Sequence, residues 1–217
     1  MADDNVILLR GANFATLPPI LRTPRLTLRP LFESDESDIF AYAHDVEMTR
    51  FLLWDAHRSK DDTRAFLTLV GQRYAQGEPY DWGIELDGRV VGTVGLFERQ
   101  ANAERAEVGY ALARPHWRKG IMREALNAIL DHCFCTLALR RIIARTHVDN
   151  LPSRALLRSA GFLHEGTLRQ DLYAKGKYWD VAYYGLLAGE FRPLGTQIER
   201  RKKAPTRAPI AHSSRVP

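Results

Sequence analysis

The 217-residue chain is long enough for one domain of ordinary size plus tails, and its 45% hydrophobic content is enough to build a full core. No stretch approaches the roughly 20 continuous apolar residues of a membrane-spanning helix, and the acidic start is unlike a signal peptide. We therefore expect a cytoplasmic protein, monomeric or homodimeric. Cys133 and Cys135 lie two positions apart in a predicted helix and should point in different directions. No His/Cys cluster has the spacing of a metal site, so we expect no metal.

The formal net charge is +5 and the pI about 9.4, and much of the positive charge lies at the C-terminal end. Residues 192–217 are basic, contain prolines and offer little to bury, so we expect a disordered tail. Two interpretations stay open: a solubilising tail, or a tether to the ribosome, RNA or another acidic surface. Residues 1–22 are interpreted as an N-terminal arm, which leaves residues 23–191 as one domain.

The periodicity of apolar residues predicts alternating strands and helices. Leu26 and Leu28 alternate with polar residues, which indicates a first strand, and Ser34, Asp35 or Ser37 could cap the helix that follows. In chain order, we expect a strand at 25–30, helices at 34–43 and 60–76 (capped by Ser59 and stopped by Gly77), strands at 80–86 and 90–97 joined by Asp87-Gly88, a strand at 105–113, a helix at 120–137, a strand at 141–148, a helix at 153–160, and strands at 162–173 and 178–187. This order predicts an α/β (α+β) fold, a mixed sheet with helices packed on it.

The most informative stretch runs from Glu107 to Ala125: a strand, a short basic turn and a long amphipathic helix. The first amides of a helix have no internal partners, and with the helix dipole they form an anion site. Gly120 lets a phosphate approach the backbone. Arg118, Lys119 and Arg123 add positive charge, which opposes the dipole unless a polyanion binds. The GxGxxG and GxxxxGK[ST] nucleotide motifs are absent, and a solvated helix start is the competing interpretation.

This stretch resembles motif A of the GNAT acetyltransferases, [QR]-x-x-G-x-[GA], with Gly120 as the central glycine. Trp117 and Met122 depart from that pattern in ways that resemble the RimJ/RimL-like branch. Further matches follow in the family's order at Asn150-Leu151-Pro152-Ser153, Gly161-Phe162, residues 165–170 and residues 180–185, so the resemblance covers about residues 21–191. It implies a GNAT fold with a mostly antiparallel central sheet, and acetyl-CoA as the acetyl donor.

The resemblance also implies where the donor binds. Asn150 should contact the pantetheine arm, although the same residue suits a helix cap, and both roles can hold. The backbone of Ala111, Leu112 and Ala113 should pair with that arm, and the amides of Arg118, Lys119, Gly120, Ile121, Met122 and Arg123 should hold the pyrophosphate.

Acetyl transfer to an amine needs a base, a stabilised oxyanion and a stabilised leaving thiolate. Glu107 leads as the base, with an exposed strand residue paired to Arg105 as the alternative. Asp171 and Tyr173 are rivals, although the RimL-like enzymes place a glutamate before the tyrosine where this chain has Leu172.

For the thiolate, the family's usual tyrosine falls at Leu157, so Ser153 is the substitute donor, with helix capping as its alternative. Trp54, Tyr80, Trp82, Asp171 and Tyr173 are the candidate acceptor-pocket residues, and simple packing is the alternative for the aromatic ones.

The resemblance makes the acceptor a primary amine, with the N-terminus of a protein, of ribosomal-protein type, as the first hypothesis. A small amine such as an amino acid, aminoglycoside or polyamine is the alternative. A catalytically inactive acyl-CoA-binding module is motivated by Leu157 and Leu172, and a nucleic-acid-binding protein by the basic tail.

Overall fold

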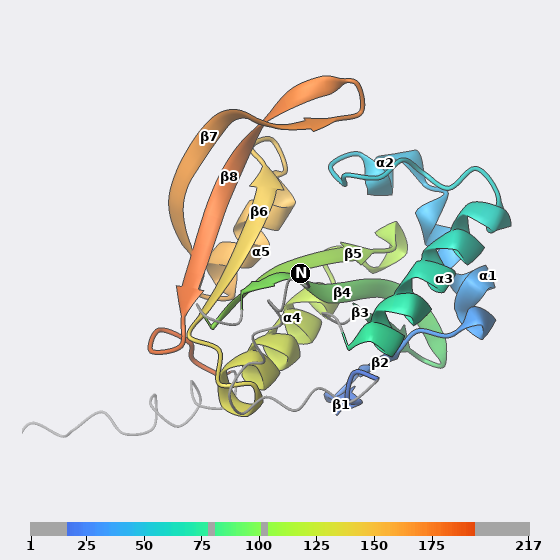
Figure 1. Cartoon of the computed structure of the whole chain (residues 1–217), viewed down its shortest axis with the longest axis horizontal. Helices are drawn as coiled ribbons and strands as arrows, with labels where there is room; N and C mark the ends of the chain where they lie inside the picture. Colours follow the sequence, from blue (N-terminus) through green and yellow to red (C-terminus); the bar gives the residue numbers. More distant parts are fainter. Residues whose placement is uncertain (1–16, 78–80, 101–103, 194–217) are drawn as a thin grey trace, which may run out of the picture.

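The computed structural model describes residues 17–77, 81–100 and 104–193, which form a mixed sheet with helices around it (Figure 1). The sheet has eight strands in the order β1-β2-β3-β4-β5-β6-β8-β7, and neighbouring strands are antiparallel except β5 and β6. This confirms the predicted mixed, mostly antiparallel sheet. The strands are β1 (Leu21–Arg22), β2 (Thr27–Pro30), β3 (Asp81–Leu86), β4 (Arg89–Gln100), β5 (Arg105–Leu112), β6 (Arg141–His147), β7 (Leu163–Ala174) and β8 (Lys177–Leu187).

The helices divide between the two halves of the sheet. Figure 1 shows α1, α2 and α3 beside the β2–β5 half, and α5 beside the half that contains β6, β7 and β8. From α4, the side chains of Leu126, Ile129 and Leu130 are fully buried in the core. The helices are α1 (Glu36–Ala43), α2 (Val46–Thr49), α3 (Lys60–Gln76), α4 (Ile121–Asp131) and α5 (Leu151–Ser159), with 3-10 turns at Glu33–Asp35 and Arg114–His116 and a π-helical turn at His132–Thr136.

The elements with strong local signals form as predicted. Ser59 caps α3 by accepting a hydrogen bond from an amide in its first turn, and Gly77 ends the helix in the left-handed region at φ 67°. Asp87 (φ 50°) and Gly88 (φ 77°) form the tight turn between β3 and β4. Both values match the left-handed pair that a two-residue hairpin turn requires.

Four features differ from the prediction. The two-residue strand β1 and the four-residue helix α2 have no counterpart in it. The helix predicted at 120–137 is α-helical to Asp131 and then widens into the π-helical turn. Ser34 does not cap a helix because it lies inside a 3-10 turn. Asp35, an alternative candidate, occupies the N-cap position of α1, but its side chain makes no capping hydrogen bond there.

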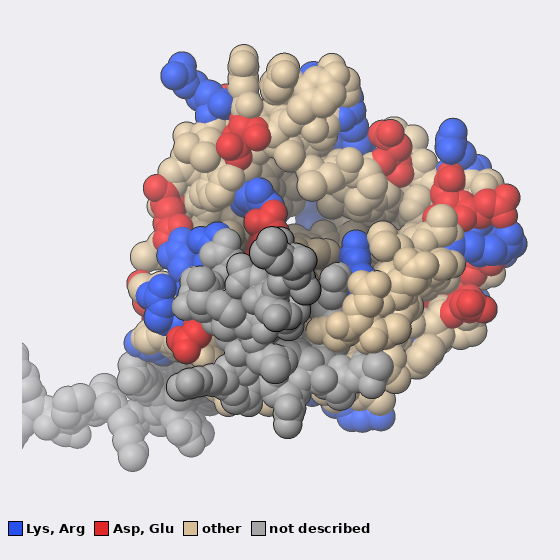
Figure 2. Space-filling model, in the orientation of Figure 1, with Lys and Arg blue, Asp and Glu red and all other residues tan. Residues whose placement is uncertain are grey.

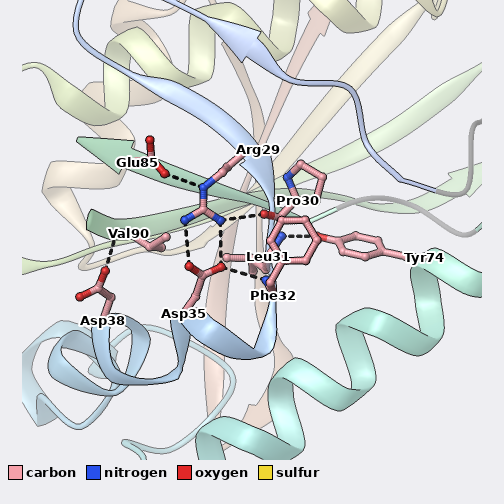
Figure 3. Close-up of polar contacts among 9 residues, drawn as sticks. All are labelled: Arg29, Pro30, Leu31, Phe32, Asp35, Asp38, Tyr74, Glu85 and Val90. Carbon is pink, nitrogen blue, oxygen red and sulfur yellow. Dashed lines mark hydrogen bonds and ion pairs between the residues drawn. The ribbon is translucent and has the colours of Figure 1, made fainter. Parts of the chain in front are cut away.

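An arginine-centred network fixes α1 and α3 against the sheet (Figure 3). Arg29 on β2 donates to Asp35 at 2.8 and 2.9 Å and to Glu85 on β3 at 2.6 Å. The hydrogen bond with Asp35 is the main cause that raises the pKa of Arg29 above its usual value. Tyr74 from α3 accepts a hydrogen bond from the amide of Leu31 at 3.1 Å. The side chain of Asp35 is 7% exposed, so this pair is better shielded from water than a surface ion pair.

Other expectations fall partly outside the described residues. The predicted arm is described only from residue 17, and the predicted tail only at residues 192–193.

Cys133 is buried and Cys135 exposed, so the two side chains point in different directions as expected. Within the described ranges, no helix is long and apolar enough to cross a membrane, and no three His, Cys, Asp or Glu side chains form a metal-binding group.

Candidate active site

A cavity opens where β5 and β6 separate. The two strands pair over three residue pairs, the last being Glu107 with Ile143, while β5 continues to Leu112 and β6 to His147. Beyond that pair the strands diverge (Figure 1), and the cavity there has a volume of about 990 Å³. Figure 2 shows a hollow at the centre of this face. Cofactor and small-molecule sites typically have volumes of this order.

The turn between β5 and α4 contains backbone amides that have no partner in the described part of the chain. Arg118 and Gly120 both adopt left-handed backbone conformations, with φ of 59° and 76°. Residues that alternate in this way form a concave nest of N–H groups that suits anions. In the described part of the chain, no amide of residues 118–123 donates a hydrogen bond. These amides are therefore available to bind an anion.

Side chains hold this turn in place by using its carbonyl groups. The indole N–H of Trp117 donates to the carbonyl of Leu112 at 2.7 Å, and Arg25 donates to the carbonyl of Lys119 at 3.0 Å. Arg25 also pairs with Glu124 in the first turn of α4, at 2.7 Å. Neither contact uses an amide of residues 118–123, so these amides remain available to a ligand.

Glu107 lies at the point where the strands separate. Its Oε2 is shielded from solvent and forms an ion pair with Nη2 of Arg145 on β6, at 2.7 Å. The same nitrogen lies 2.6 Å from Glu98, so one arginine serves two carboxylates. Burial raises the pKa of Glu107 above its usual value, although the charge of Arg145 opposes the shift. Arg145, and not Arg105, is thus the ion-pair partner of Glu107.

Ser153 faces the cavity from the first turn of α5. Asn150 accepts a hydrogen bond from the amide of Ser153 at 3.2 Å, so Asn150 has the helix-capping role that was its alternative interpretation. Both residues also line the cavity. The hydroxyl of Ser153 lies 2.8 Å from the hydroxyl of Tyr110 on β5, which joins β5 to α5 across the separation.

The part of the cavity formed by the segment after α2 and by β7 is mostly apolar. Trp54 and Leu172 line it, and the ring of Trp54 lies 5.2 Å from that of His57. Asp171 on β7 also lines it and accepts a hydrogen bond from Tyr183 at 2.6 Å. Further aromatic side chains come from several elements: Phe51, Phe66, Phe97 and Trp179.

Two predicted pocket residues do not line this cavity. Asp81 on β3 faces it, so the next residue, Trp82, points to the opposite face of the sheet. There Trp82 is fully buried against His132. Tyr173 is 63% exposed and packs against Tyr178 near the end of the β7–β8 hairpin. Tyr80 lies outside the described residues.

Apart from Asn150, the residues predicted to bind the donor occupy two places. Ala111 lines the cavity, and Leu112 and Ala113 lead from it to the turn at residues 114–120. Gly120 is the N-cap of α4, and Ile121 and Met122 are buried in its first turn. Along the chain, Ala111 in the cavity lining is followed by the end of β5, then by the nest of amides, and then by α4.

Sequence reasoning missed Tyr110 and Arg145. Both lie on strands that were predicted, but their roles depend on contacts across the sheet to Ser153 and Glu107. Tyr110 stands next to Gly109 in the very motif that carried the resemblance. The available signal was a tyrosine, whose hydroxyl can form hydrogen bonds, directly after a glycine on the strand that leads to the predicted phosphate turn.

Comparison with known proteins agrees with this geometry. Residues 25–163 match the family model described as an acetyltransferase (GNAT) domain. The N-acetyltransferase YoaA of Bacillus subtilis is 33% identical over 171 residues, which cover 78% of this chain and 97% of that protein. The ribosomal-protein-serine acetyltransferase of Escherichia coli is 28% identical, with coverage of 58% and 71%.

Among solved structures, Mycobacterium smegmatis RimJ in complex with CoA-disulfide aligns with a TM-score of 0.69 and 27% identity, covering 79% of this chain and 87% of that one. The family match and these relatives confirm the resemblance to the RimJ/RimL-like branch. The chain belongs to the GNAT acetyltransferase family, and it is an acetyl-CoA-dependent N-acetyltransferase.

Proposed function

We propose that the acceptor of this N-acetyltransferase is the N-terminal amine of a protein, with ribosomal proteins as the first class to test. The Escherichia coli relative, a ribosomal-protein-serine acetyltransferase by name, motivates that class. The observation that carries the proposal is the acceptor side of the cavity, where one carboxylate without a cationic partner lies beside an apolar mouth.

Arginines neutralise most of the carboxylates that line the cavity. Arg73 pairs with the buried Asp81 at 2.9 Å. Arg145 pairs with Glu98 and Glu107. An acceptor with several positive charges would therefore find few carboxylates available to it in this cavity.

Asp171 is different. Among the described residues it has no lysine or arginine within ion-pair distance, and its bond from the Tyr183 hydroxyl leaves further acceptor positions open. One ammonium group fits one such carboxylate, whereas polyamines and aminoglycosides carry several. The charge pattern thus favours an acceptor with a single amine, such as a polypeptide N-terminus.

The mouth of the cavity suits the rest of a polypeptide. Leu53 and Trp54 are exposed on the segment after α2, and Tyr173 and Tyr178 are exposed on the β7–β8 hairpin. Figure 2 shows mostly uncharged atoms along the upper rim of the hollow. Exposed apolar groups around a cleft favour binding of a partner chain over a free small cation.

The residues around the β5–α4 turn fit acetyl-CoA. The amides of residues 118–123 suit a pyrophosphate, and the open edge of β5 suits a strand-like pantetheine arm. Ala113 donates to the carbonyl of Val91 on β4 at 2.8 Å. Because alternate residues of a strand face opposite neighbours, the backbone groups of Tyr110 and the amide of Leu112 would point to the open edge, while the Leu112 carbonyl accepts from Trp117.

In this proposal each side chain has one task. Asp171 binds the acceptor ammonium, which loses one proton to solvent to become a neutral amine. Glu107 takes the second proton as the amide forms, directly or through water, aided by its raised pKa. Backbone N–H groups on the open edge of β5 stabilise the oxyanion. Ser153 donates a hydrogen bond to the leaving sulfur. Acetyl-CoA supplies the activated acetyl group.

The experiment is a thiol-release assay with purified protein, acetyl-CoA and a panel of N-terminal peptides, amino acids, polyamines and aminoglycosides, with CoA binding measured in parallel. We expect turnover of peptides, blocked when their α-amine is already acetylated. Turnover of small amines alone would overturn the acceptor proposal. Binding of CoA without any turnover on intact ribosomes and peptides would also count against it.

The basic tail can be tested separately. Removing residues 194–217 should leave turnover of short peptides unchanged under either interpretation of the tail. If the tail is a tether, the same deletion should weaken binding to ribosomes in a salt-dependent way. Unchanged ribosome binding would leave the solubilising role.

A further inference from the structure

Two hydroxyl groups meet inside the cavity, one from each side of the strand separation. The Tyr110 and Ser153 oxygens are 2.8 Å apart, and both residues line the cavity. Ser153 lies in the first turn of α5, and its backbone amide is already bonded to Asn150. Leu157, one helical turn later, is fully buried in the core and offers no polar group. The Ser153 hydroxyl, which is paired with Tyr110, is thus the side-chain hydrogen-bond donor that α5 supplies to this part of the cavity.

The direction of the bond between these hydroxyl groups decides what Ser153 can do. Each hydroxyl carries one hydrogen, so Ser153 can donate into the cavity only if it accepts from Tyr110. The Tyr110 hydroxyl has no other hydrogen-bond partner among the described residues. Tyr110 is therefore able to donate to Ser153, and a negative charge in the cavity would favour that arrangement, because hydrogen bonds in a chain strengthen one another.

We propose that Tyr110 is a positioning residue that donates to Ser153 and so turns the serine hydrogen toward the leaving sulfur of CoA. The inference rests on the proposed placement of the thioester beside Ser153. As the amine nitrogen forms its bond to the acetyl carbon, the C–S bond breaks and the sulfur keeps the electron pair. Tyr110 and Ser153 stabilise that thiolate through a two-bond chain.

No proton leaves Tyr110 in this step. Burial raises the pKa of Tyr110 far above its usual value, so its hydroxyl stays protonated throughout the working pH range. The proton lost by the amine goes to Glu107 or to water, and the thiolate takes its proton from solvent after release. The hydroxyl pair therefore acts as a fixed hydrogen-bond donor and not as an acid.

The first test needs no turnover. The ionisation of the CoA thiol bound to the full-length protein is followed by ultraviolet thiolate absorbance against pH. The wild type should lower the pKa of the bound thiol relative to free CoA. Tyr110→Phe and Ser153→Ala should each raise it by about one unit, the equivalent of one lost hydrogen bond to a charged group.

The second test is a double-mutant cycle on kcat, with any acceptor that the wild type uses. Tyr110→Phe should lower kcat about tenfold with the KM for acetyl-CoA nearly unchanged. Adding Tyr110→Phe to Ser153→Ala should lower kcat little further, because the serine hydrogen is already gone. Ser153→Thr, which keeps a hydroxyl, should restore sensitivity to Tyr110→Phe.

Tyr184→Phe is the matched control. Tyr184 is fully buried, and its hydroxyl accepts from Arg154 on the same helix α5 at 3.2 Å, without contacting Ser153. Its loss should reduce stability but leave the pKa of the bound thiol unchanged. Unchanged thiol ionisation in Tyr110→Phe, or additive losses of kcat in the double variant, would overturn the inference. Failure of the acceptor proposal would show separately, as a wild-type protein that lowers the pKa of the bound CoA thiol but does not acetylate peptides.

Discussion

Lys175, in the turn between β7 and β8, donates a hydrogen bond of 2.7 Å to the carbonyl of Thr49 at the end of α2, 126 residues earlier in the chain. This contact joins the hairpin to the segment that carries Leu53 and Trp54. Residues of both segments, Trp54 and Asp171 among them, line the cavity, so we expect their spacing to set the width of its opening.

Replacing Lys175 with Met should remove the contact to Thr49 and let the opening of the cavity widen. We expect the KM for the acceptor to rise several-fold while the KM for acetyl-CoA stays within about twofold, because one hydrogen bond of about 1 kcal/mol is lost on the acceptor side. Lys177→Met, at the other end of the same turn, is the control for lost charge. Equal kinetic effects of the two variants would show that the Thr49 contact does not shape the mouth.

Glu107→Gln should lower kcat about 100-fold or more if Glu107 is the base, and remove the acidic limb of the pH–rate profile. The base must be ionised, so activity should rise with pH through its pKa, which burial raises. The charge of Glu98 also raises this pKa. Glu98→Gln should therefore shift the acidic limb to lower pH without removing it. A pH profile that both variants leave unaltered would exclude Glu107 as the base.

Gly120→Ala should weaken binding of acetyl-CoA about tenfold, by straining the nest of amides. A left-handed conformation costs a residue with a Cβ about 1–2 kcal/mol, and the new atom would lie 3.4 Å from the Arg25 guanidinium. Gly77→Ala is the matched control, with φ 67° and open space around it at the far end of α3. Both variants should lose similar thermal stability, but only Gly120→Ala should lose CoA affinity in calorimetry.

Asp171→Asn should raise the KM for a peptide acceptor about tenfold and leave that for acetyl-CoA unchanged, because a charge-assisted contact to the ammonium is lost. Asp149→Asn, which also removes an exposed carboxylate near the site but lies outside the cavity lining, should have little effect. If peptide KM responds equally to both, Asp171 does not bind the acceptor.

The parts of the fold that were predicted correctly carry their information locally. Asp87-Gly88 specifies its hairpin within two residues, and Ser59 and Gly77 specify the two ends of α3. The strand β1 has no such signal. It exists because Leu21 pairs with Leu28 on β2, and two residues show no period.

Features of the site that are consecutive in the sequence could be predicted, whereas contacts between distant segments could not. The turn before α4 could be recognised because its basic residues and Gly120 are consecutive. Trp82 was misplaced because a strand's period does not say which set of alternate side chains faces the cavity. The pairing of Tyr110 with Ser153 joins residues 43 positions apart, and no local pattern encodes it.

The short pairing between β5 and β6 has a mechanical consequence. With three residue pairs between them, the sheet consists of two well-hydrogen-bonded halves that meet along a narrow hinge. Small rotations about that hinge would widen or narrow the space between the strands without breaking the ladders inside either half. A ligand that hydrogen-bonds along the open edge of β5 would restrain this motion, so amide exchange at Ile142 and Ile143 should slow when the donor is bound.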